Sequence, residues 1–205
     1  MESNASFDDN GLLYVNKNSL SKELCEEMIS YFESDTHTYP GVTASGLNHD
    51  IKDTTDLVIS HLADRSPWDI INKTLAAELK YNIKVYIDGL AEKCDTEYDM
   101  FDACELFIPT IQMQKYNKNV GKYVYHNDYS CDFATKHVRQ ITFLWYINDV
   151  EEGGETEFWK NQKVKPEAGK LVLFPAHWTF PHKANKPVSD NKYIITGWIY
   201  EIYTS

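Results

Sequence analysis

The first half of the chain places its apolar residues at helical spacing in two segments. In the earlier segment they fall on one face of a helix, at Leu24, Met28, Ile29 and Phe32. Ser21 precedes this stripe as a candidate cap, and Glu23 puts a negative charge in the first turn, where the helix dipole favours it. The pattern predicts a helix that opens at Ser21 and ends near Ser34.

The later segment has a longer stripe with steps of three and four residues, through Trp68, Ile71, Leu75, Leu79, Ile83, Tyr86 and Leu90. Ser66 can cap its start, Pro67 suits the first helical position, and Asp69 stands three residues after the cap. We expect a helix of about 25 residues, roughly 38 Å long at the usual rise. A helix of this length in one domain should lie across a whole sheet as its support.

From Cys104 onward the pattern changes to short apolar or alternating runs separated by turn residues. The predicted strands are residues 106–116, 122–127, 138–148, 155–159, 163–165, 170–174 and 192–203. Earlier in the chain, residues 1–10 are typical of a frayed terminus, 11–15 of a short strand, and 35–65 of a long loop with a possible strand at 56–59. Many short strands at this spacing predict a sandwich or barrel.

The composition fits one globular domain. The chain has 205 residues, 42% of them hydrophobic and 14% aromatic, which is enough for a packed core. We divide the single domain 1–205 into mainly helical support and loops at 1–103 and a strand-rich core at 104–205. The net charge is -11, from 31 acidic and 20 basic residues, and Arg65 and Arg139 are the only arginines. This balance argues against a nucleic-acid binder and against binding to anionic membranes.

Cysteine usage and the first residues predict a cytoplasmic protein. The cysteines, at Cys25, Cys94, Cys104 and Cys131, have no zinc-like spacing. A disulfide framework is not expected at this chain length, so we expect reduced thiols. Residues 1–10 lack the basic and apolar regions of a signal peptide, and no apolar run is long enough to span a membrane.

His126 and Asp128 are the strongest candidates for chemistry in the strand-rich part. Alternate residues of a strand face the same side, so these two share a face and Asn127 turns away. One imidazole and one carboxylate converging from a strand are two of the three ligands of a 2-His-1-carboxylate site, which binds non-haem Fe(II). We take His182 as the third ligand and His177 as its rival. A lone His-x-Asp also occurs by chance in surface loops.

The last predicted strand carries polar residues where both of its faces are otherwise apolar. Lys192 can be an edge residue whose ammonium reaches water. Together with Thr196 it can also hold a carboxylate at the bottom of a cavity. Tyr146 has the same two interpretations, as a packed tyrosine with one satisfied hydroxyl or as a hydrogen-bond donor to that carboxylate.

Other polar residues have simpler interpretations. Histidines outside the candidate site are expected on the surface or in loops: His37, His49, His61 and His137. Lys52 and its polar neighbours in 35–65 are expected more as surface residues than as substrate contacts. Cys131, close to the metal-binding strand, is expected to be structural or incidental, although an exposed thiol there can be oxidised.

Several motifs follow one another between Tyr116 and Trp198. The run Tyr116-Asn-Lys-Asn-Val-Gly-Lys-Tyr-Val-Tyr-His-Asn-Asp128 comes first, followed by Arg139-Gln-Ile-Thr142, Tyr146-Ile-Asn148 and Gly153-Gly-Glu-Thr-Glu-Phe158. Pro166-Glu-Ala-Gly169, Pro181-His182 and Lys192-Tyr-Ile-Ile-Thr-Gly-Trp198 complete the series. This order resembles the prolyl 4-hydroxylase family of the Fe(II)/2-oxoglutarate-dependent dioxygenases. Gly197 departs from the oxygen-sensing branch of the family, which usually carries a side chain there.

The resemblance implies an α+β protein, a double-stranded β-helix (jelly roll) supported by N-terminal helices. It implies an Fe(II) site whose ligands are His126, Asp128 and His182. It also implies that 2-oxoglutarate contacts Lys192, Thr196, Tyr146 and Tyr116, with Lys192 pairing with the distal carboxylate. O₂ is the other co-substrate, and ascorbate is expected as a reductant.

The function implied by the resemblance is hydroxylation of a substrate C–H bond with release of succinate and CO₂, on proline in a peptide or protein. A hydroxylase of a free amino acid or another small molecule is the alternative within the class, and a nucleic-acid demethylase is disfavoured by the acidic balance. From other classes we consider a non-catalytic metal-binding sensor and a zinc hydrolase. A pure metal-binding module has no need for Lys192, Thr196 and Tyr146, and no His-Glu-x-x-His motif supports a hydrolase. The oligomeric state is left open by the sequence.

Overall fold

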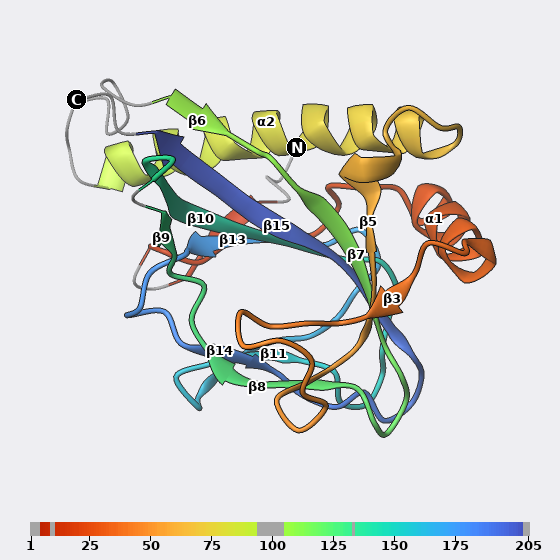
Figure 1. Cartoon of the computed structure of the whole chain (residues 1–205). Helices are drawn as coiled ribbons and strands as arrows, with labels where there is room; N and C mark the ends of the chain where they lie inside the picture. The colour runs from red at the N-terminus through yellow and green to blue at the C-terminus, as the bar shows by residue number, and fades with distance from the viewer. Residues whose placement is uncertain (1–4, 9–10, 94–104, 133, 203–205) are drawn as a thin grey trace.

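The computed structural model describes residues 5–8, 11–93, 105–132 and 134–202. Two antiparallel sheets face each other, and the helices lie outside the larger sheet (Figure 1). This arrangement confirms the double-stranded β-helix with helical support that the sequence predicted. The strands that carry the candidate site residues belong to both sheets, so the site lies between them.

The larger sheet is built around β10 and β15. In the described part of the chain its order is β1-β2-β13-β10-β15-β7-β5-β3, with β6 beside β15 and β9 beside β10. Both central strands are buried on both faces over most of their length, as expected for a strand between two layers. The bounds are β1 Ala5–Phe7, β2 Tyr14–Asn16, β3 Tyr39–Pro40, β5 Thr55–Val58, β6 Glu105–Phe107, β7 Ile111–Tyr116, β9 Cys131–Asp132, β10 His137–Tyr146, β13 Leu171–Pro175 and β15 Lys192–Ile202.

The smaller sheet has the described order β12-β11-β14-β8-β4. Its strands are β4 Lys52–Asp53, β8 Lys122–His126, β11 Thr156–Phe158, β12 Gln162–Val164 and β14 His182–Ala184. The sequence pattern did not predict β14, because three residues after a proline show no periodicity. Its pairing with β8 brings His182 directly opposite His126.

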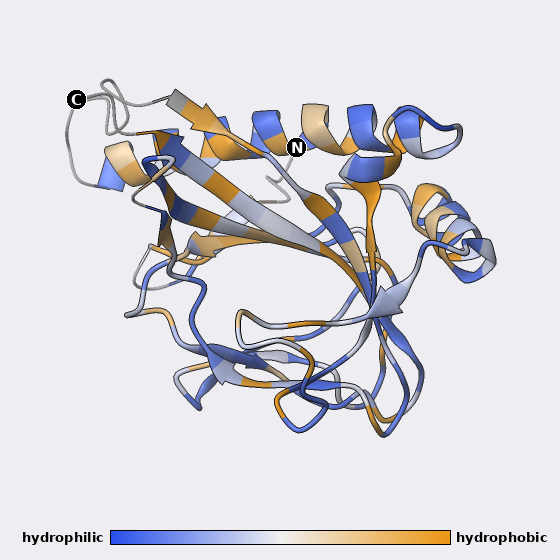
Figure 2. Ribbon diagram, in the orientation of Figure 1, coloured by the Kyte–Doolittle hydropathy of each residue, from blue (hydrophilic) through white to orange (hydrophobic). Residues whose placement is uncertain are grey.

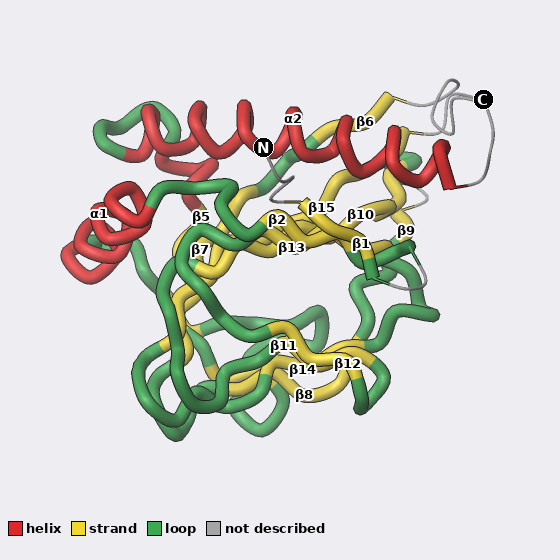
Figure 3. Tube along the Cα trace, turned by 180° about the vertical axis from the view of Figure 1, so that it is seen from behind, coloured by secondary structure: helices red, strands yellow, loops and turns green. Residues whose placement is uncertain are grey.

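The helices support the larger sheet from outside, as Figure 3 shows from behind. α1 (Lys22–Ser34) is capped as predicted, since the Ser21 side chain accepts a hydrogen bond from the Leu24 N–H at 3.2 Å. α2 (Trp68–Lys93) has 26 residues and begins one residue later than predicted, so Pro67 precedes the helix. Its most buried positions include Asn82, which donates to the backbone carbonyl of Glu78 and accepts from Tyr14. No helix in the described residues is both long and apolar enough to cross a membrane.

Two apolar clusters lie on the two faces of the larger sheet. The cluster on the helix side includes Phe32, Leu75, Leu79, Phe143, Trp145 and Ile195. The cluster between the sheets includes Leu144, Phe158, Val172, Phe174, Phe180 and Ile194. Hydrophobic residues concentrate along the strands of the larger sheet and hydrophilic ones in the loops (Figure 2). The first cluster fixes the sheet on its support, and the second forms part of the wall of the space between the sheets.

The N-terminal part contains more strand than the sequence predicted. Residues 5–7 form β1, which pairs with β2, so the described part of 1–10 is not a frayed end. Within 35–65, β3, β4 and the 3-10 helix Ile59–Leu62 accompany the predicted strand near 56–59. These strands are two to four residues long and rich in polar residues. They form because β5 pairs with β7, β4 pairs with β8, and β3 pairs with β5, and no local sequence pattern reveals these pairings.

Candidate active site

Three side chains meet between the sheets in a metal-ligand arrangement. His126 ends β8, Asp128 follows two residues later, and His182 begins β14. Their candidate ligand atoms all lie within 4.8 Å of one another. Nε2 of His126 lies 3.8 Å from Oδ1 of Asp128, and Nε2 of His182 lies 3.5 Å from Oδ2. The predicted triad is therefore assembled, with His182 rather than His177 as its third member.

Backbone carbonyls orient both imidazole rings. Nδ1 of His126 donates to the carbonyl of Val124 at 2.8 Å, and Nδ1 of His182 donates to that of Phe180 at 3.1 Å. A carbonyl oxygen only accepts, so the proton of each neutral ring is assigned to Nδ1. Each Nε2 is then left with a free lone pair aimed at Asp128. This is the tautomer that a metal-binding histidine needs.

Electrostatics keep His126 and Asp128 in the protonation states that bind a cation. Burial and the neighbouring His182 lower the pKa of His126 to about 4, so its ring is neutral at neutral pH. Burial acts to raise the pKa of Asp128, but His182, His126 and the Thr142 hydroxyl outweigh it, and the net shift is downward. Thr142 Oγ1 donates to Oδ2 of Asp128 at 2.8 Å. The result is a carboxylate beside the neutral ring of His126 and the ring of His182, a donor set suited to Fe(II).

The ligands open into a cavity of about 380 Å³ between the sheets. Its wall from the larger sheet carries polar residues of β7 and β15, while His126 and His182 come from the smaller sheet. Gln112, Gln114 and Tyr116 lie at alternate positions of β7 and all line the cavity, as do Lys192, Ile194 and Thr196 of β15. A cavity of this size accommodates a small organic acid and part of a substrate.

Lys192 is the least exposed of the cavity cations, with 1% of its surface accessible. Its Nζ donates to the carbonyl of Gly154 at 3.0 Å and lies 4.1 Å from the ring centroid of Tyr116. Burial lowers its pKa to about 7, although the charge of Glu155 opposes the shift. A buried cation that lines a cavity without a carboxylate partner is costly, and binding of an anion removes that cost. Lys192 is therefore suited to the carboxylate of 2-oxoglutarate.

The other predicted 2-oxoglutarate contacts differ in their access to the cavity. Thr196 lines it and donates to the carbonyl of Phe143 at 2.8 Å. Tyr116 also lines it, and its hydroxyl donates to Gln114 at 3.0 Å. Tyr146 is not among the lining residues; its hydroxyl donates to Oγ1 of Thr156 at 2.6 Å, and Thr156 does line the cavity. Tyr146 thus lies one residue behind the cavity wall.

His177, the rival third ligand, lies outside the cluster. Its Nδ1 pairs with Thr179 Oγ1 at 3.0 Å, its ring packs edge-on against Tyr129, and its side chain is exposed. Cys131, at β9, is partly exposed and free, and Cys25 is buried and free. Cys94 and Cys104 lie outside the described residues.

The structure gives roles to two residues, Arg139 and Thr142, that the sequence placed in a motif without assigning them a function. Arg139 stacks on Trp198, with its guanidinium carbon 3.5 Å from a ring centroid, and donates to the backbone carbonyl of Asp128 at 3.3 Å. It thereby holds the backbone at the candidate metal-binding carboxylate. Thr142 orients that carboxylate directly. The alternation of Thr142, Leu144 and Tyr146 along one strand was visible in the sequence, but not the partner of the Thr142 hydroxyl.

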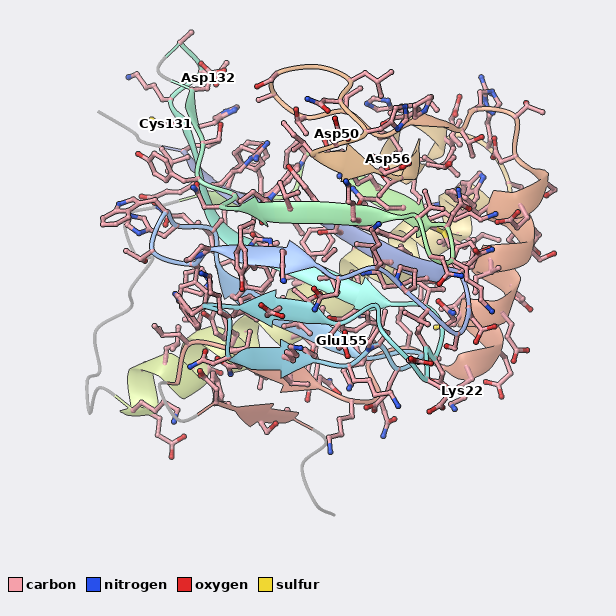
Figure 4. The ribbon with its side chains drawn as sticks, turned by 90° about the horizontal axis from the view of Figure 1, so that it is seen from below. Lys22, Asp50, Asp56, Cys131, Asp132 and Glu155 are labelled. Carbon is pink, nitrogen blue, oxygen red and sulfur yellow. The ribbon has the colours of Figure 1, made fainter. Side chains whose placement is uncertain are left out.

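Lys52 corrects the expectation of a surface residue. Its side chain is 4% exposed, lines the cavity and forms an ion pair with Asp56. The sequence gave no signal for this burial, because a lysine in a polar segment is normally solvated. Figure 4, seen from the side of the smaller sheet, shows Asp56 among the N-terminal strands next to the edge formed by β8.

Comparison with known proteins agrees with this geometry. Residues 111–200 match the family model of the 2OG-Fe(II) oxygenase superfamily. The chain is 29% identical over 225 aligned positions to "Probable prolyl 4-hydroxylase 3" of Arabidopsis thaliana, covering 91% of this chain and 68% of that protein. These matches confirm the predicted family resemblance, with Fe(II) as the metal and 2-oxoglutarate as the co-substrate.

Solved structures share the fold. The 2-oxoglutarate complex of the viral collagen prolyl hydroxylase of Paramecium Bursaria Chlorella virus-1 has a TM-score of 0.64 at 19% identity, covering 92% of this chain and 96% of that one. A prolyl-4-hydroxylase of Pseudomonas putida gives 0.64 at 17% identity, covering 91% of both chains. A Trichoplax adhaerens prolyl hydroxylase, solved with a hypoxia inducible factor peptide fragment, gives 0.67 at 18% identity, covering 95% of this chain and 84% of that one. At these identities the likeness establishes the double-stranded β-helix alone.

Proposed function

We propose that this protein, a 2-oxoglutarate- and Fe(II)-dependent oxygenase of the prolyl 4-hydroxylase type, hydroxylates proline residues in a peptide or protein. The observation that carries the proposal is the convergence of His126, Asp128 and His182 on a cavity that also contains the buried Lys192. A metal site alone would serve a sensor. A metal site beside a buried cation fits a metal and a carboxylate-bearing co-substrate together.

In this proposal His126, Asp128 and His182 bind Fe(II) through Nε2, a carboxylate oxygen and Nε2. Three protein ligands on one side leave positions for a chelating 2-oxo acid and O₂. When bound, Fe(II) and 2-oxoglutarate supply the oxidising chemistry, in which 2-oxoglutarate, O₂ and a substrate C–H group yield succinate, CO₂ and a C–OH group. The chain itself positions the reactants and excludes water, and Thr142 and Arg139 fix Asp128.

Lys192 is proposed to pair with the distal carboxylate of 2-oxoglutarate. Thr196 lies four positions further along the same strand, and Thr156, on β11 of the smaller sheet, also lines the cavity. The Tyr146 hydroxyl lies 2.6 Å from Oγ1 of Thr156 and 3.2 Å from the carbonyl of Val164. In the shorter contact Tyr146 donates to Thr156, which leaves the hydroxyl proton of Thr156 free to point into the cavity and reach the same carboxylate. Tyr146 then acts through Thr156, while Tyr116 supports the ammonium of Lys192 with its ring face.

The substrate assignment is supported by the names of the relatives. The Arabidopsis protein is a probable prolyl 4-hydroxylase, and the Trichoplax enzyme was solved with a peptide. A free amino acid or other small molecule is the alternative substrate. The free Cys25 and Cys131 support the cytoplasm as the proposed location.

The test is succinate formation from 2-oxoglutarate in air, with Fe(II) and ascorbate, without and with a pool of proline-containing peptides. We expect iron-dependent succinate that rises with peptide, together with a mass increase of one oxygen atom on proline. His126→Ala serves as the control for background decarboxylation. Succinate formation that does not change with peptides but rises with free amino acids would instead indicate a small-molecule substrate. Iron binding without succinate under any condition would favour the sensor.

A further inference from the structure

An ion pair stands in the wall of the active-site cavity without a part in the chemistry described above. Nζ of Lys52, on β4, lies 2.6 Å from Oδ2 of Asp56, on β5. The two side chains are 4% and 2% exposed, and both line the cavity. Burial of two charges costs free energy that their attraction rarely exceeds, so a buried pair is weak evidence for a stabilising role. A role in binding is therefore considered for the Lys52–Asp56 pair.

The pair lies one aromatic ring away from the metal ligands. Nζ of Lys52 is 5.7 Å from the ring centroid of Tyr123. That ring stacks on the imidazole of His126, with 3.5 Å between centroids and 14° between planes. A group bound at Lys52 would therefore neighbour the substrate atom that reacts at the metal, without reaching the metal itself.

The hydrogen bonds of the pair leave both donors and acceptors unused. An ammonium has three N–H donors, and among the described residues one of them is accounted for, by Asp56. Asp56 accepts from Lys52 through Oδ2 and from the Thr54 hydroxyl through Oδ1 at 2.7 Å. A carboxylate has about four lone-pair sites, so acceptor capacity also remains.

The pair as a whole is neutral, with a donor and an acceptor side by side. An additional anion would be repelled by Asp56, and an additional cation by Lys52. An apolar group would leave the unused donors desolvated. The chemical group that satisfies both members is neutral, accepts through an oxygen and donates through an N–H, as an amide does.

We propose that Lys52 and Asp56 form a specificity site that binds an amide group of the substrate beside the hydroxylated residue, with Lys52 donating to the amide oxygen and Asp56 accepting from the amide N–H. This inference rests on the proposed function and identifies the part of the peptide substrate that the cavity binds. The amide before a proline has no N–H, so the main-chain candidate is the amide that follows it. A neighbouring Asn or Gln side chain offers the same chemistry.

A purely structural role is the competing explanation. β4 belongs to the smaller sheet and β5 to the larger one, so the ion pair also ties the two sheets together. A structural tie would affect stability and leave the dependence on substrate amides unchanged. The two explanations therefore differ in a measurement on the substrate rather than on the protein.

The test uses the full chain loaded with Zn(II) and 2-oxoglutarate, which holds the site without turnover. The probes are a blocked five-residue peptide with a central proline flanked by alanines, the same peptide with an ester in place of the amide after proline, and an ester peptide that also carries Asn next to proline. The key variant is Lys52→Met/Asp56→Leu, because a single substitution leaves a buried unpaired charge whereas an apolar pair does not. The matched control is Lys84→Met/Asp88→Leu, which removes another Lys–Asp pair at the same spacing on the exposed side of α2.

We expect the double variant to raise the peptide Kd about tenfold or more, because hydrogen bonds to charged groups contribute more to binding than those between neutral groups. The ester should weaken binding to the wild type by a similar factor and have little further effect in the double variant. Rescue of the ester peptide by Asn would show that a side-chain amide can also occupy the site, and no rescue would restrict the site to the main-chain amide. The Kd of 2-oxoglutarate should stay within about twofold, since Lys192 is unchanged.

In the iron-loaded enzyme the double variant should raise the peptide KM more than it lowers kcat, while the control pair changes neither. Equal peptide and ester affinities in the wild type, no peptide binding by the wild type, or an unchanged peptide Kd in the double variant would each overturn the inference. Hydroxyproline formation by the wild type is measured in parallel. If hydroxyproline forms but the peptide Kd of the double variant is unchanged, only the amide site is overturned. If no hydroxyproline forms but the peptide Kd values follow the expected pattern, only the proposed reaction is overturned.

Discussion

The ammonium of Lys192 donates to the backbone carbonyl of Gly154 at 3.0 Å and makes no ion pair among the described residues. Its pKa is lowered to about 7 because burial disfavours the charge. At neutral pH this lysine is close to half protonated until an anion enters the cavity. The relationship gives the binding of 2-oxoglutarate a pH dependence that can be measured.

We predict that 2-oxoglutarate binds more weakly as pH rises above 7. The dianion favours the protonated lysine, so the pKa of Lys192 is higher in the complex than in the free protein. Between those two pKa values binding takes up a proton, and Kd rises by up to about tenfold per pH unit. Calorimetric titrations from pH 6.5 to 8.5, in two buffers of different ionisation enthalpy, measure both the affinity and the proton uptake. The matched variant is Lys192→Arg, whose guanidinium stays charged and should flatten the profile. A pH-independent wild-type Kd would contradict the assignment.

Lys192→Met should have opposite effects on stability and binding. The folded pKa of about 7 lies below the 10.5 of an unperturbed lysine. The unfolded chain therefore binds more protons, and the wild-type free energy of unfolding rises with pH across that window. An apolar side chain removes this cost, so urea unfolding at pH 7 should show that the free energy of unfolding increases by a few kcal/mol, on the order set by the pKa shift.

The same Lys192→Met variant should raise the KM for 2-oxoglutarate about 10- to 100-fold, with smaller changes in Fe(II) affinity. A destabilised variant with normal KM would show that the lysine is structural.

Substitution of His182 and of His177 should have clearly different effects on metal binding. His182→Ala removes a ligand and should abolish metal binding, measured as metal content after dialysis and as the loss of the thermal shift produced by Fe(II) or Zn(II). His177→Ala removes an exposed ring that contacts Thr179 and Tyr129, and should change metal affinity by less than about threefold. The reverse result would reassign the third ligand.

Thr156 and Tyr146 should differ because one lines the cavity and the other lies behind it. Thr156→Val removes the hydroxyl that can reach the carboxylate, and we expect the KM for 2-oxoglutarate to rise about tenfold. Tyr146→Phe removes the hydroxyl that orients Thr156 and also contacts the carbonyl of Val164, so its effect should be smaller, about threefold, and should nearly vanish when combined with Thr156→Val. Additive effects in the double variant would place Tyr146 in direct contact with the co-substrate.

Gly197 is explained by its neighbours rather than by its backbone. A Cβ at this position would lie 2.6 Å from the ring of Phe143 and closer still to the carbonyl of Thr110. Gly197→Ala should therefore destabilise the protein by about 1–3 kcal/mol, measured by urea unfolding. The combination with Phe143→Leu, which frees space beside the glycine, should recover part of that loss. An unchanged midpoint in the single variant would show that the strand moves aside at no cost.

Residues close together in the sequence were predicted well. His126 and Asp128 are two positions apart in a strand-like run, and alternation alone puts them on one face. The helices at 22–34 and 68–93 follow from apolar stripes that extend over several turns. In each case the signal is periodic and local, and the tertiary structure only confirms it.

The sequence by itself determined the fold class, the two supporting helices and the His-x-Asp pair. Tertiary structure decided what depends on strand pairing between distant segments. The pairing of β14 with β8 places His182 opposite His126 and leaves His177 outside. The pairing of β4 with β8 and of β5 with β7 buries Lys52 against Asp56 in a segment that resembles a polar loop. A hydrogen bond links Tyr146 to Thr156, and it is Thr156 that lines the cavity. These features depend on backbone hydrogen bonds and side-chain contacts across the cavity, and such interactions leave no periodic trace along the chain.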